Sequence, residues 1–88
     1  MLKLEAVQAF ASIVETGSIT GAARRLALSK SVVSERLTEL ERALDAKLVH
    51  RTTRALVVTE DGKAFYARAR LILRDVEAAA SEVSERNG

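Results

Sequence analysis

The sequence predicts a mostly α-helical fold with a core of three helices, a short two-stranded β wing and a long final helix. Three observations predict it. Apolar residues recur at three- and four-residue spacing along most of the chain. Two β-prone runs flank a short basic turn between residues 47 and 59. No proline interrupts the helical patterns, and 88 residues suffice for one small domain.

The first helix is predicted from an apolar stripe that forms one helical face, made of Leu4, Val7, Phe10, Ala11 and Val14. Gly17 suits the left-handed position that ends a helix, and Ser18 can cap the next one. A short second helix is expected from Ile19 to Leu26. Its small residues Ala22 and Ala23 allow a neighbouring helix to approach closely.

The third helix is expected from Lys30 to Leu44, with Ser29 as its N-cap. Its apolar face consists of Val33, Leu37, Leu40 and Leu44, and the opposite face is polar. Two helices joined by a turn of about three residues, the second with a polar face, are the parts of a helix-turn-helix. We expect this motif at about residues 18–38.

The runs 47–51 and 56–59 predict a hairpin that must pack on the helices, because an isolated two-stranded hairpin is only marginally stable. We interpret residues 47–59 as a wing. Thr59 then caps a last helix, whose first turn carries Glu60 and Asp61, where the helix dipole favours acids. A helix from there to about Arg86 would be about 40 Å long.

The last helix carries apolar residues at alternating four- and three-residue steps, namely Phe65, Ala69, Ile72, Val76, Ala79 and Val83. This heptad spacing predicts a dimer interface between two copies of the helix. The alternative is that Phe65 to Leu73 packs on the core of the same chain and the remainder has no partner. We therefore divide the chain into a domain at 1–59 and a dimerisation helix at 60–88.

Charge is unevenly distributed, although the formal net charge is only +2. Between Arg24 and Arg54 there are eight basic and four acidic residues, whereas the segment from Glu60 onward has five basic and six acidic residues. A basic segment of this kind favours nucleic-acid binding, although an ordinary solvated surface is the alternative. A helical protein-interaction adaptor that does not bind DNA is the competing function.

Composition disfavours other classes of function. The chain has no cysteine, one histidine and no glycine-rich phosphate loop, so we expect neither an enzyme, nor a metal site, nor a cofactor. His50 is interpreted as packed or solvent-facing and not as a ligand. No apolar run is long enough to span a bilayer and the first residues lack a signal-peptide core, so we expect a cytoplasmic protein.

In order and spacing, the sequence resembles the LysR-type family of bacterial transcriptional regulators over essentially its whole length. The stretches that carry the resemblance are 10–18 (FASIVETGS), 22–26 (AARRL), 28–29, 33–34, 40–41, Leu44, Leu48, 50–54 (HRTTR) and 59–62 (TEDG). The resemblance implies a winged helix-turn-helix that binds double-stranded DNA and a linker helix that pairs two copies. The dimer would read an interrupted palindrome with T near one end and A near the other.

The resemblance also implies a larger C-terminal domain that binds a small-molecule inducer, and a tetramer is possible only in such a full-length protein. No such domain follows Gly88 in this sequence. We expect a part of a longer protein, with a naturally short protein as the alternative.

A recognition helix reads base edges with residues near its N-terminus. The candidates for base readout are Ser29, Lys30, Ser31, Val32, Ser34 and Glu35. Lys30 could bind guanine or a phosphate, and Val32 could contact a thymine methyl. Glu35 could accept from cytosine N4, or it could be a solvated carboxylate paired with Lys30 or Arg36.

The candidates for contacts with the DNA backbone lie on the second helix, further along the third helix and on the wing, namely Thr20, Arg25, Arg36, Thr38, Arg51, Thr52, Thr53 and Arg54. The alternative for Arg51 is a salt bridge inside the domain. The family often has Gln-Pro where this chain has Lys30-Ser31, and a basic or amide side chain where it has Glu35. The DNA preference of this chain is therefore expected to differ from that of the family, because of the changes at these positions.

Overall fold

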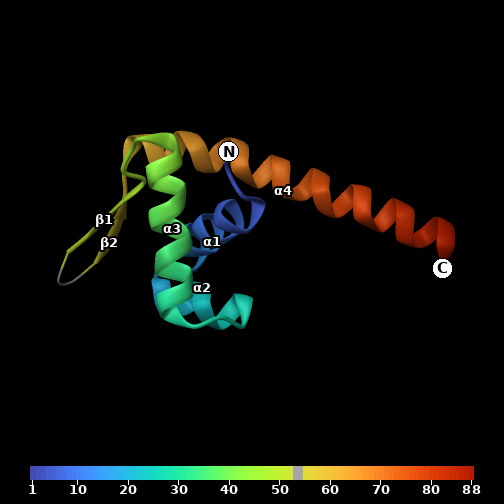
Figure 1. Cartoon of the computed structure of the whole chain (residues 1–88), viewed down its shortest axis with the longest axis horizontal. Helices are drawn as coiled ribbons and strands as arrows, with labels where there is room; N and C mark the ends of the chain where they lie inside the picture. Colours follow the sequence, from blue (N-terminus) through green and yellow to red (C-terminus); the bar gives the residue numbers. More distant parts are fainter. Residues whose placement is uncertain (53–54) are drawn as a thin grey trace.

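The computed structural model describes residues 1–52 and 55–88. Four helices and one hairpin follow each other in the predicted order (Figure 1). Their bounds are α1 Leu4–Thr16, α2 Ile19–Leu26, α3 Lys30–Leu44, β1 Val49–Arg51, β2 Leu56–Val58 and α4 Glu60–Asn87. The predicted mostly helical fold with a β wing is confirmed. Among the described residues, no helix is long and apolar enough to cross a membrane.

Polar side chains cap three helices at the predicted residues. The hydroxyl of Ser18 accepts a hydrogen bond from the Gly21 amide at 2.8 Å, and Ser29 accepts from the Val32 amide at 3.2 Å. Thr59 caps α4 in the same way. Each cap satisfies an amide that has no partner inside its helix. These local interactions explain why the helix starts follow from the sequence.

Left-handed residues end the first three helices. Gly17 has a φ of 78°, as predicted. Asp45 ends α3 with a φ of 52°, a left-handed conformation that aspartate tolerates better than most residues. Ala27 adopts the same conformation, with a φ of 56°, in the turn between α2 and α3. The tight turn of the helix-turn-helix is therefore built on a non-glycine residue in the left-handed region.

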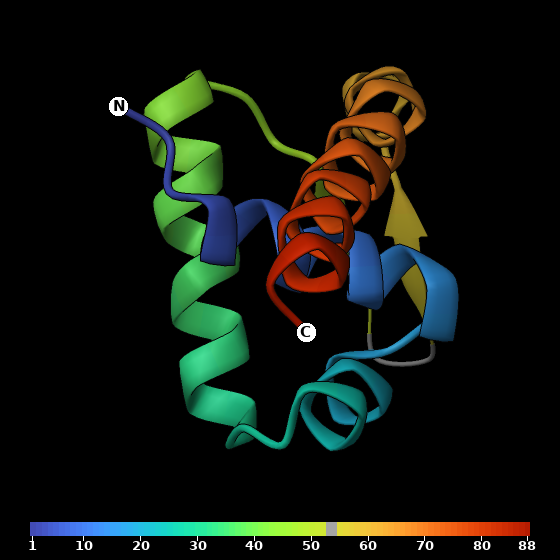
Figure 2. The ribbon, with the colours of Figure 1, turned by 90° about the vertical axis from the view of Figure 1, so that its right-hand side faces the viewer.

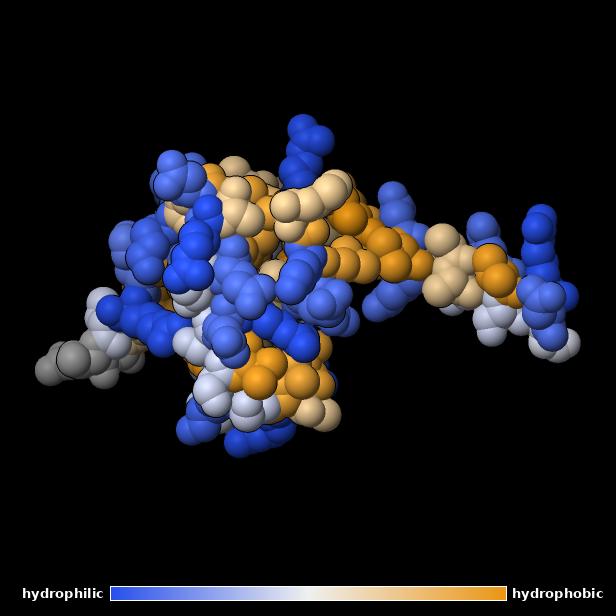
Figure 3. All heavy atoms as spheres, viewed as in Figure 1, coloured by the Kyte–Doolittle hydropathy of each residue, from blue (hydrophilic) through white to orange (hydrophobic). Residues whose placement is uncertain are grey.

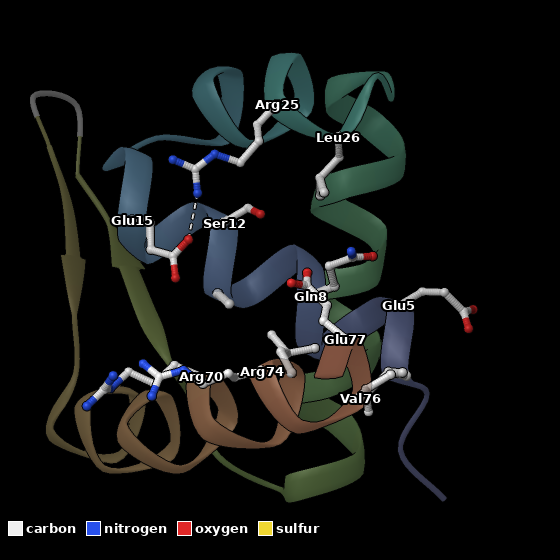
Figure 4. A pocket seen from close by; sticks show the side chains of 13 residues that line it. Glu5, Gln8, Ser12, Glu15, Arg25, Leu26, Arg70, Arg74, Val76 and Glu77 are labelled. Atoms are coloured by element: carbon white, nitrogen blue, oxygen red, sulfur yellow. Dashed lines mark hydrogen bonds and ion pairs between the residues drawn. The ribbon is translucent and has the colours of Figure 1, made fainter. Parts of the chain in front are cut away.

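The core forms around α1, which packs against α2, α3 and α4. Figures 2 and 4 show α1 between α2 and α4. The largest fully buried side chains are Phe10, Ile13, Leu37, Leu40, Leu48 and Val33. Ala22 and Ala23 are buried, as expected for residues that allow close helix packing. Phe10 also meets Phe65 of α4, with ring centroids 5.9 Å apart.

The wing is an antiparallel pair in which Val49 lies opposite Val58 and Arg51 opposite Leu56. Beyond this pair, the amide of Thr52 donates to the carbonyl of Ala55 at 2.8 Å. The strands are shorter than the predicted wing, which begins at Lys47. The amides of Leu48 and Val49 donate instead to the Glu41 carboxylate, at 2.7 and 3.3 Å. Glu41 is buried and thereby attaches the base of the wing to α3.

The first part of α4 belongs to the core, and the rest extends away from it (Figure 1). Ala69 is fully buried, and Phe65, Tyr66 and Leu73 pack around the core. Packing therefore continues past the predicted domain boundary at residue 59, because the three-helix core is too small to bury its own apolar surface. Gly62 is buried because α4 passes directly over the carbonyl of Leu48.

Candidate nucleic-acid interface

The N-terminal end of α3 presents small polar and basic side chains at the surface. Ser29, Lys30, Ser31 and Glu35 are exposed, and Val32 and Ser34 are partly exposed. The hydroxyls of Ser29 and Ser31 lie 3.4 Å apart. All six candidates for base readout thus lie at or within two turns of one helix end, where free amides also favour an anion.

Arg51 of the wing contacts this helix directly. Its Nη2 donates a hydrogen bond to Oγ of Ser34 at 2.6 Å. The predicted alternative, an ion pair inside the domain, is not what the structure shows, because the partner is a neutral hydroxyl. The contact brings the wing and α3 together although their residues are 17 positions apart. The guanidinium thereby lies beside the polar face of α3.

The basic side chains of this region are largely uncompensated. The ion pairs among residues 1–52 and 55–88 join Arg25 to Glu15, Lys47 to Glu41 and Lys63 to Glu60. None of these pairs involves Lys30, Arg36 or Arg51. Glu35 likewise forms no ion pair with Lys30 or Arg36 within the described part of the chain. Positive charge that no carboxylate neutralises, among the described residues, is suited to neutralising phosphates.

Arg36 and Thr38 lie on different flanks of α3. The hydroxyl of Thr38 donates to the carbonyl of Ser34 at 3.0 Å, and Thr38 lines a groove between α3 and β1 together with Lys47, His50 and Arg51. His50 is exposed there. Arg36 lines a separate groove with Lys3 and Glu5. The structure therefore gathers Ser34, Thr38 and Arg51 on the wing side and separates Arg36 from them.

The side chain of Arg25 points away from the end of α3 and toward α1 (Figure 4). Its Nη1 donates to Oε1 of Glu15 at 2.6 Å. Thr20, the other candidate on α2, is exposed in the first turn of that helix. Of the wing candidates, Thr52 is exposed, whereas Thr53 and Arg54 lie outside the described residues.

Glu15 was not among the candidates, although it joins three helices. Its Oε2 accepts a hydrogen bond from the Tyr66 hydroxyl at 2.7 Å, while Oε1 binds Arg25. The hydrogen bond to the Glu15 carboxylate raises the pKa of Tyr66, and burial adds to this rise. Tyr66 and Glu15 are 51 positions apart, so no local sequence signal could indicate the contact. Glu41, also missed, is likewise defined by its tertiary contacts.

The heptad seam of α4 is divided by the packing. Phe65 and Ala69 face the core of their own chain, as the alternative interpretation expected. Ile72, Val76 and Val83 are 53%, 43% and 61% exposed, and Ala79 is exposed as well. Figure 3 shows apolar side chains along the projecting part of α4. The exposed part of the seam therefore begins at Ile72.

Comparison with curated proteins reveals relatives that regulate transcription. The chain is 42% identical over 77 residues to an HTH-type transcriptional repressor of Pseudomonas aeruginosa. The aligned region covers 88% of this chain and 24% of that protein. It is 40% identical over 77 residues to the HTH-type transcriptional activator AaeR of Escherichia coli, covering 88% of this chain and 25% of that protein. The chain spans about a quarter of the length of these relatives.

Solved structures share the fold. The DNA-binding domain of BenM, in a complex with catB site 1 DNA, matches with a TM-score of 0.88 and 29% identity over 94% of this chain and 92% of that one. An OxyR mutant of Corynebacterium glutamicum with bound hydrogen peroxide matches with a TM-score of 0.96 and 30% identity, covering 100% of this chain and 27% of that one. These matches confirm the winged helix-turn-helix with a long C-terminal helix.

Residues 4–63 match the family described as bacterial regulatory helix-turn-helix protein, lysR family. The matched segment includes α1, the helix-turn-helix, the wing and the first turn of α4. It makes up more than half of the chain. The chain belongs to the lysR family of bacterial regulatory helix-turn-helix proteins.

Proposed function

We propose that this chain binds double-stranded DNA in a sequence-specific manner, as the DNA-binding domain of a LysR-type transcriptional regulator. The observation that carries the proposal is the contact between Arg51 and Ser34, which unites the wing and the N-terminal half of α3 in one surface. The BenM domain with the same fold is seen bound to DNA, and the relatives are named transcriptional regulators.

In this proposal α3 enters the major groove with its N-terminal end. Small side chains at Ser31 and Ser34 let the helix approach the bases closely, and Lys30 donates to guanine or to a phosphate. Val32 contacts a thymine methyl. Glu35, which has no ion pair with Lys30 or Arg36, accepts from cytosine N4. Ser29 caps the helix and leaves neighbouring amides directed at the DNA.

Contacts with phosphates and sugars fix the position of the domain on the duplex without reading sequence. We assign this role to Thr20 on α2, to Arg36 and Thr38 on α3, and to the wing residues Arg51, Thr52, Thr53 and Arg54. Arg25 is not assigned to this set, because its guanidinium is bound to Glu15. Lysine and arginine contacts of this kind make affinity strongly dependent on salt.

Two copies of the chain are proposed to pair through the projecting part of α4. Ile72, Val76, Ala79 and Val83 leave an apolar stripe that a second helix would cover. A twofold dimer presents two recognition helices to two half-sites, so the operator would be an approximate palindrome. In this division residues 1–59 bind DNA. Within residues 60–88, the first turns of α4 complete the core and the part from Ile72 onward links the two copies.

A gel-shift titration at two salt concentrations tests the DNA proposal. Duplexes selected from random DNA with this chain serve as probes, and a scrambled duplex is the comparison. We expect at least 1,000-fold tighter binding to the selected duplex, on the order typical of specific sites. Affinity should fall steeply as salt rises. Failure to bind any duplex at low salt would favour the adaptor function.

Lys30→Ala should weaken binding to the selected duplex at least tenfold, on the order of the 1–3 kcal/mol of a base contact. Lys63→Ala is the matched control, because it removes the same charge from an exposed pair with Glu60 on α4. An equal effect of both variants would mean that charge alone matters and that α3 does not read the sequence.

A further inference from the structure

The carboxylate of Glu15 is a junction between the helix-turn-helix and the projecting helix. It lies in the last turn of α1 and uses its two oxygens separately. Oε1 binds Arg25, in the last turn of α2, and Oε2 binds Tyr66, in the second turn of α4. Figure 4 shows Arg25 directed at Glu15 across the gap between α2 and α1.

The junction contributes little to the stability of the fold. The side chains of Glu15 and Arg25 are 38% and 49% exposed, and exposed ion pairs contribute about 0–1 kcal/mol. The core contacts of α1 with α2 and α4 are made by other residues, such as Phe10 with Phe65. A charged group that touches three helices but supports the core only weakly is placed to adjust their relative orientation.

Orientation matters because α4 is long. The segment from Tyr66 to the end of α4 extends about 30 Å. A tilt of roughly 6° at its base moves its far end by about 3 Å, which is about the rise of one base pair. In a dimer joined through that segment, such a tilt changes the separation of the two recognition helices.

We propose that Glu15 is a positioning residue that holds α4 at a set angle to the helix-turn-helix and thereby selects the spacing between half-sites. Tyr66 connects α4 to the Glu15 carboxylate, and Arg25 connects α2 to the same carboxylate. Arg25 then acts through Glu15 and does not bind a phosphate. This inference rests on the proposed function, since it requires DNA binding by a dimer paired through α4.

The test measures affinity for duplexes in which two selected half-sites are separated by the preferred distance or by one or two base pairs more or fewer. A duplex with a single half-site is measured in parallel. We expect Tyr66→Phe and Glu15→Gln to bind the single half-site within about twofold of the unsubstituted chain, because base contacts are unchanged. For these variants, the ratio of affinity for the best spacing to affinity for the second-best spacing should fall at least threefold.

Two controls separate positioning from a structural effect. Lys63→Met breaks an exposed pair on α4 that does not join helices, and it should leave the spacing preference unchanged. Arg25→Ala should relax the spacing preference but keep the salt dependence on the single half-site. If Arg25→Ala instead lowers the slope of log affinity against log salt concentration by about one, Arg25 is a phosphate contact and the inference is wrong.

The outcomes distinguish the inference from the function on which it rests. Unchanged spacing preference in Tyr66→Phe, with the unsubstituted chain binding and discriminating spacings, overturns the inference alone. If the unsubstituted chain binds DNA but ignores spacing, both the proposed dimer and the inference fail. A loss of single half-site binding in Tyr66→Phe would mean that the junction maintains the domain itself, which also overturns the positioning role.

Discussion

The guanidinium of Arg51 and the hydroxyl of Ser34 are joined by a hydrogen bond of 2.6 Å, so the wing strand β1 is attached to the recognition helix α3. Ser34 accepts from Arg51 and keeps its own hydrogen available for another acceptor. The two side chains therefore form one unit, and neither should act on DNA independently of the other.

A double-mutant cycle with Arg51→Lys and Ser34→Ala should show this coupling in DNA affinity. Lysine cannot reproduce the planar guanidinium fork, so it loses the contact while keeping the charge. We expect the two losses to be non-additive by about 0.5 kcal/mol or more in a binding titration. The cycle of Arg51→Lys with Thr20→Ala, which share no hydrogen bond, should be additive. Additive losses in the first cycle would show that the contact is irrelevant in the complex.

The substitution Glu41→Gln should destabilise the domain by about 1–2 kcal/mol in urea unfolding, because hydrogen bonds to a charged acceptor are stronger than neutral ones. The buried carboxylate accepts from the amides of Leu48 and Val49. Glu41→Leu leaves both amides without an acceptor and should cost about 3 kcal/mol or more. Glu39→Gln, exposed on the same helix, serves as control and should change stability by less than about 0.5 kcal/mol. Equal stability of all three variants would contradict the anchoring role.

Gly62→Ala should destabilise the domain, although glycine-to-alanine changes inside helices usually stabilise. A Cβ at Gly62 would overlap the carbonyl oxygen of Leu48 and lie 2.8 Å from Cγ1 of Val58. Forcing extra atoms into such a contact costs about 1–3 kcal/mol, against a gain of about 0.5–1 kcal/mol in helix propensity. Thermal unfolding measures the result. A higher melting temperature for Gly62→Ala would show that α4 does not approach Leu48 so closely.

The combined change Ile72→Asp and Val76→Asp should convert dimers to monomers in sedimentation equilibrium. Both side chains are exposed in the single chain, so the domain itself should remain folded. The matched control is Leu71→Asp with Ala78→Asp, which places the same charges on another face of α4, because successive residues lie about 100° apart around a helix. A dimer that survives the first pair but not the control pair would place the interface on that other face.

The ionisation of Tyr66 reports its bond to Glu15 directly, because Tyr66 is the only tyrosine and the chain has no tryptophan. The Glu15 carboxylate raises the pKa of Tyr66 above its ordinary value of 10.0, whereas Arg70 and Arg25 act in the opposite direction. Absorbance during alkaline titration should therefore show a midpoint above that of the unfolded chain. Glu15→Gln should lower the midpoint, and an unchanged midpoint would show that the two residues do not meet in solution.

The same shift predicts a dependence of stability on pH. Because the folded pKa of Tyr66 is raised, its contribution is complete below the unfolded pKa and is lost as pH rises through the folded pKa. The unfolding free energy of the unsubstituted chain should therefore decline in this alkaline range more than that of Tyr66→Phe. A parallel decline of both proteins would leave no role for Tyr66.

Features that depend on neighbours in sequence were predictable. The caps Ser18, Ser29 and Thr59 each bind an amide three residues ahead, so a short stretch contains both partners. Gly17 ends α1 for a reason that is equally local. Long-range contacts were not predictable in this way. Glu41 carries no local mark that distinguishes a buried acceptor from a solvated carboxylate.

The sequence by itself determined the four helices, the wing and the polar end of α3, because apolar periodicity and capping act over a few residues. Tertiary structure decided which charged and apolar side chains remain available. It bound Arg25 to Glu15, brought Arg51 to Ser34, and buried Ala69 while leaving Ile72 exposed. These outcomes depend on how α1, α4 and the wing pack against one another. Since the partners come from distant elements, their pairing is set by packing of the whole domain and not by any local pattern.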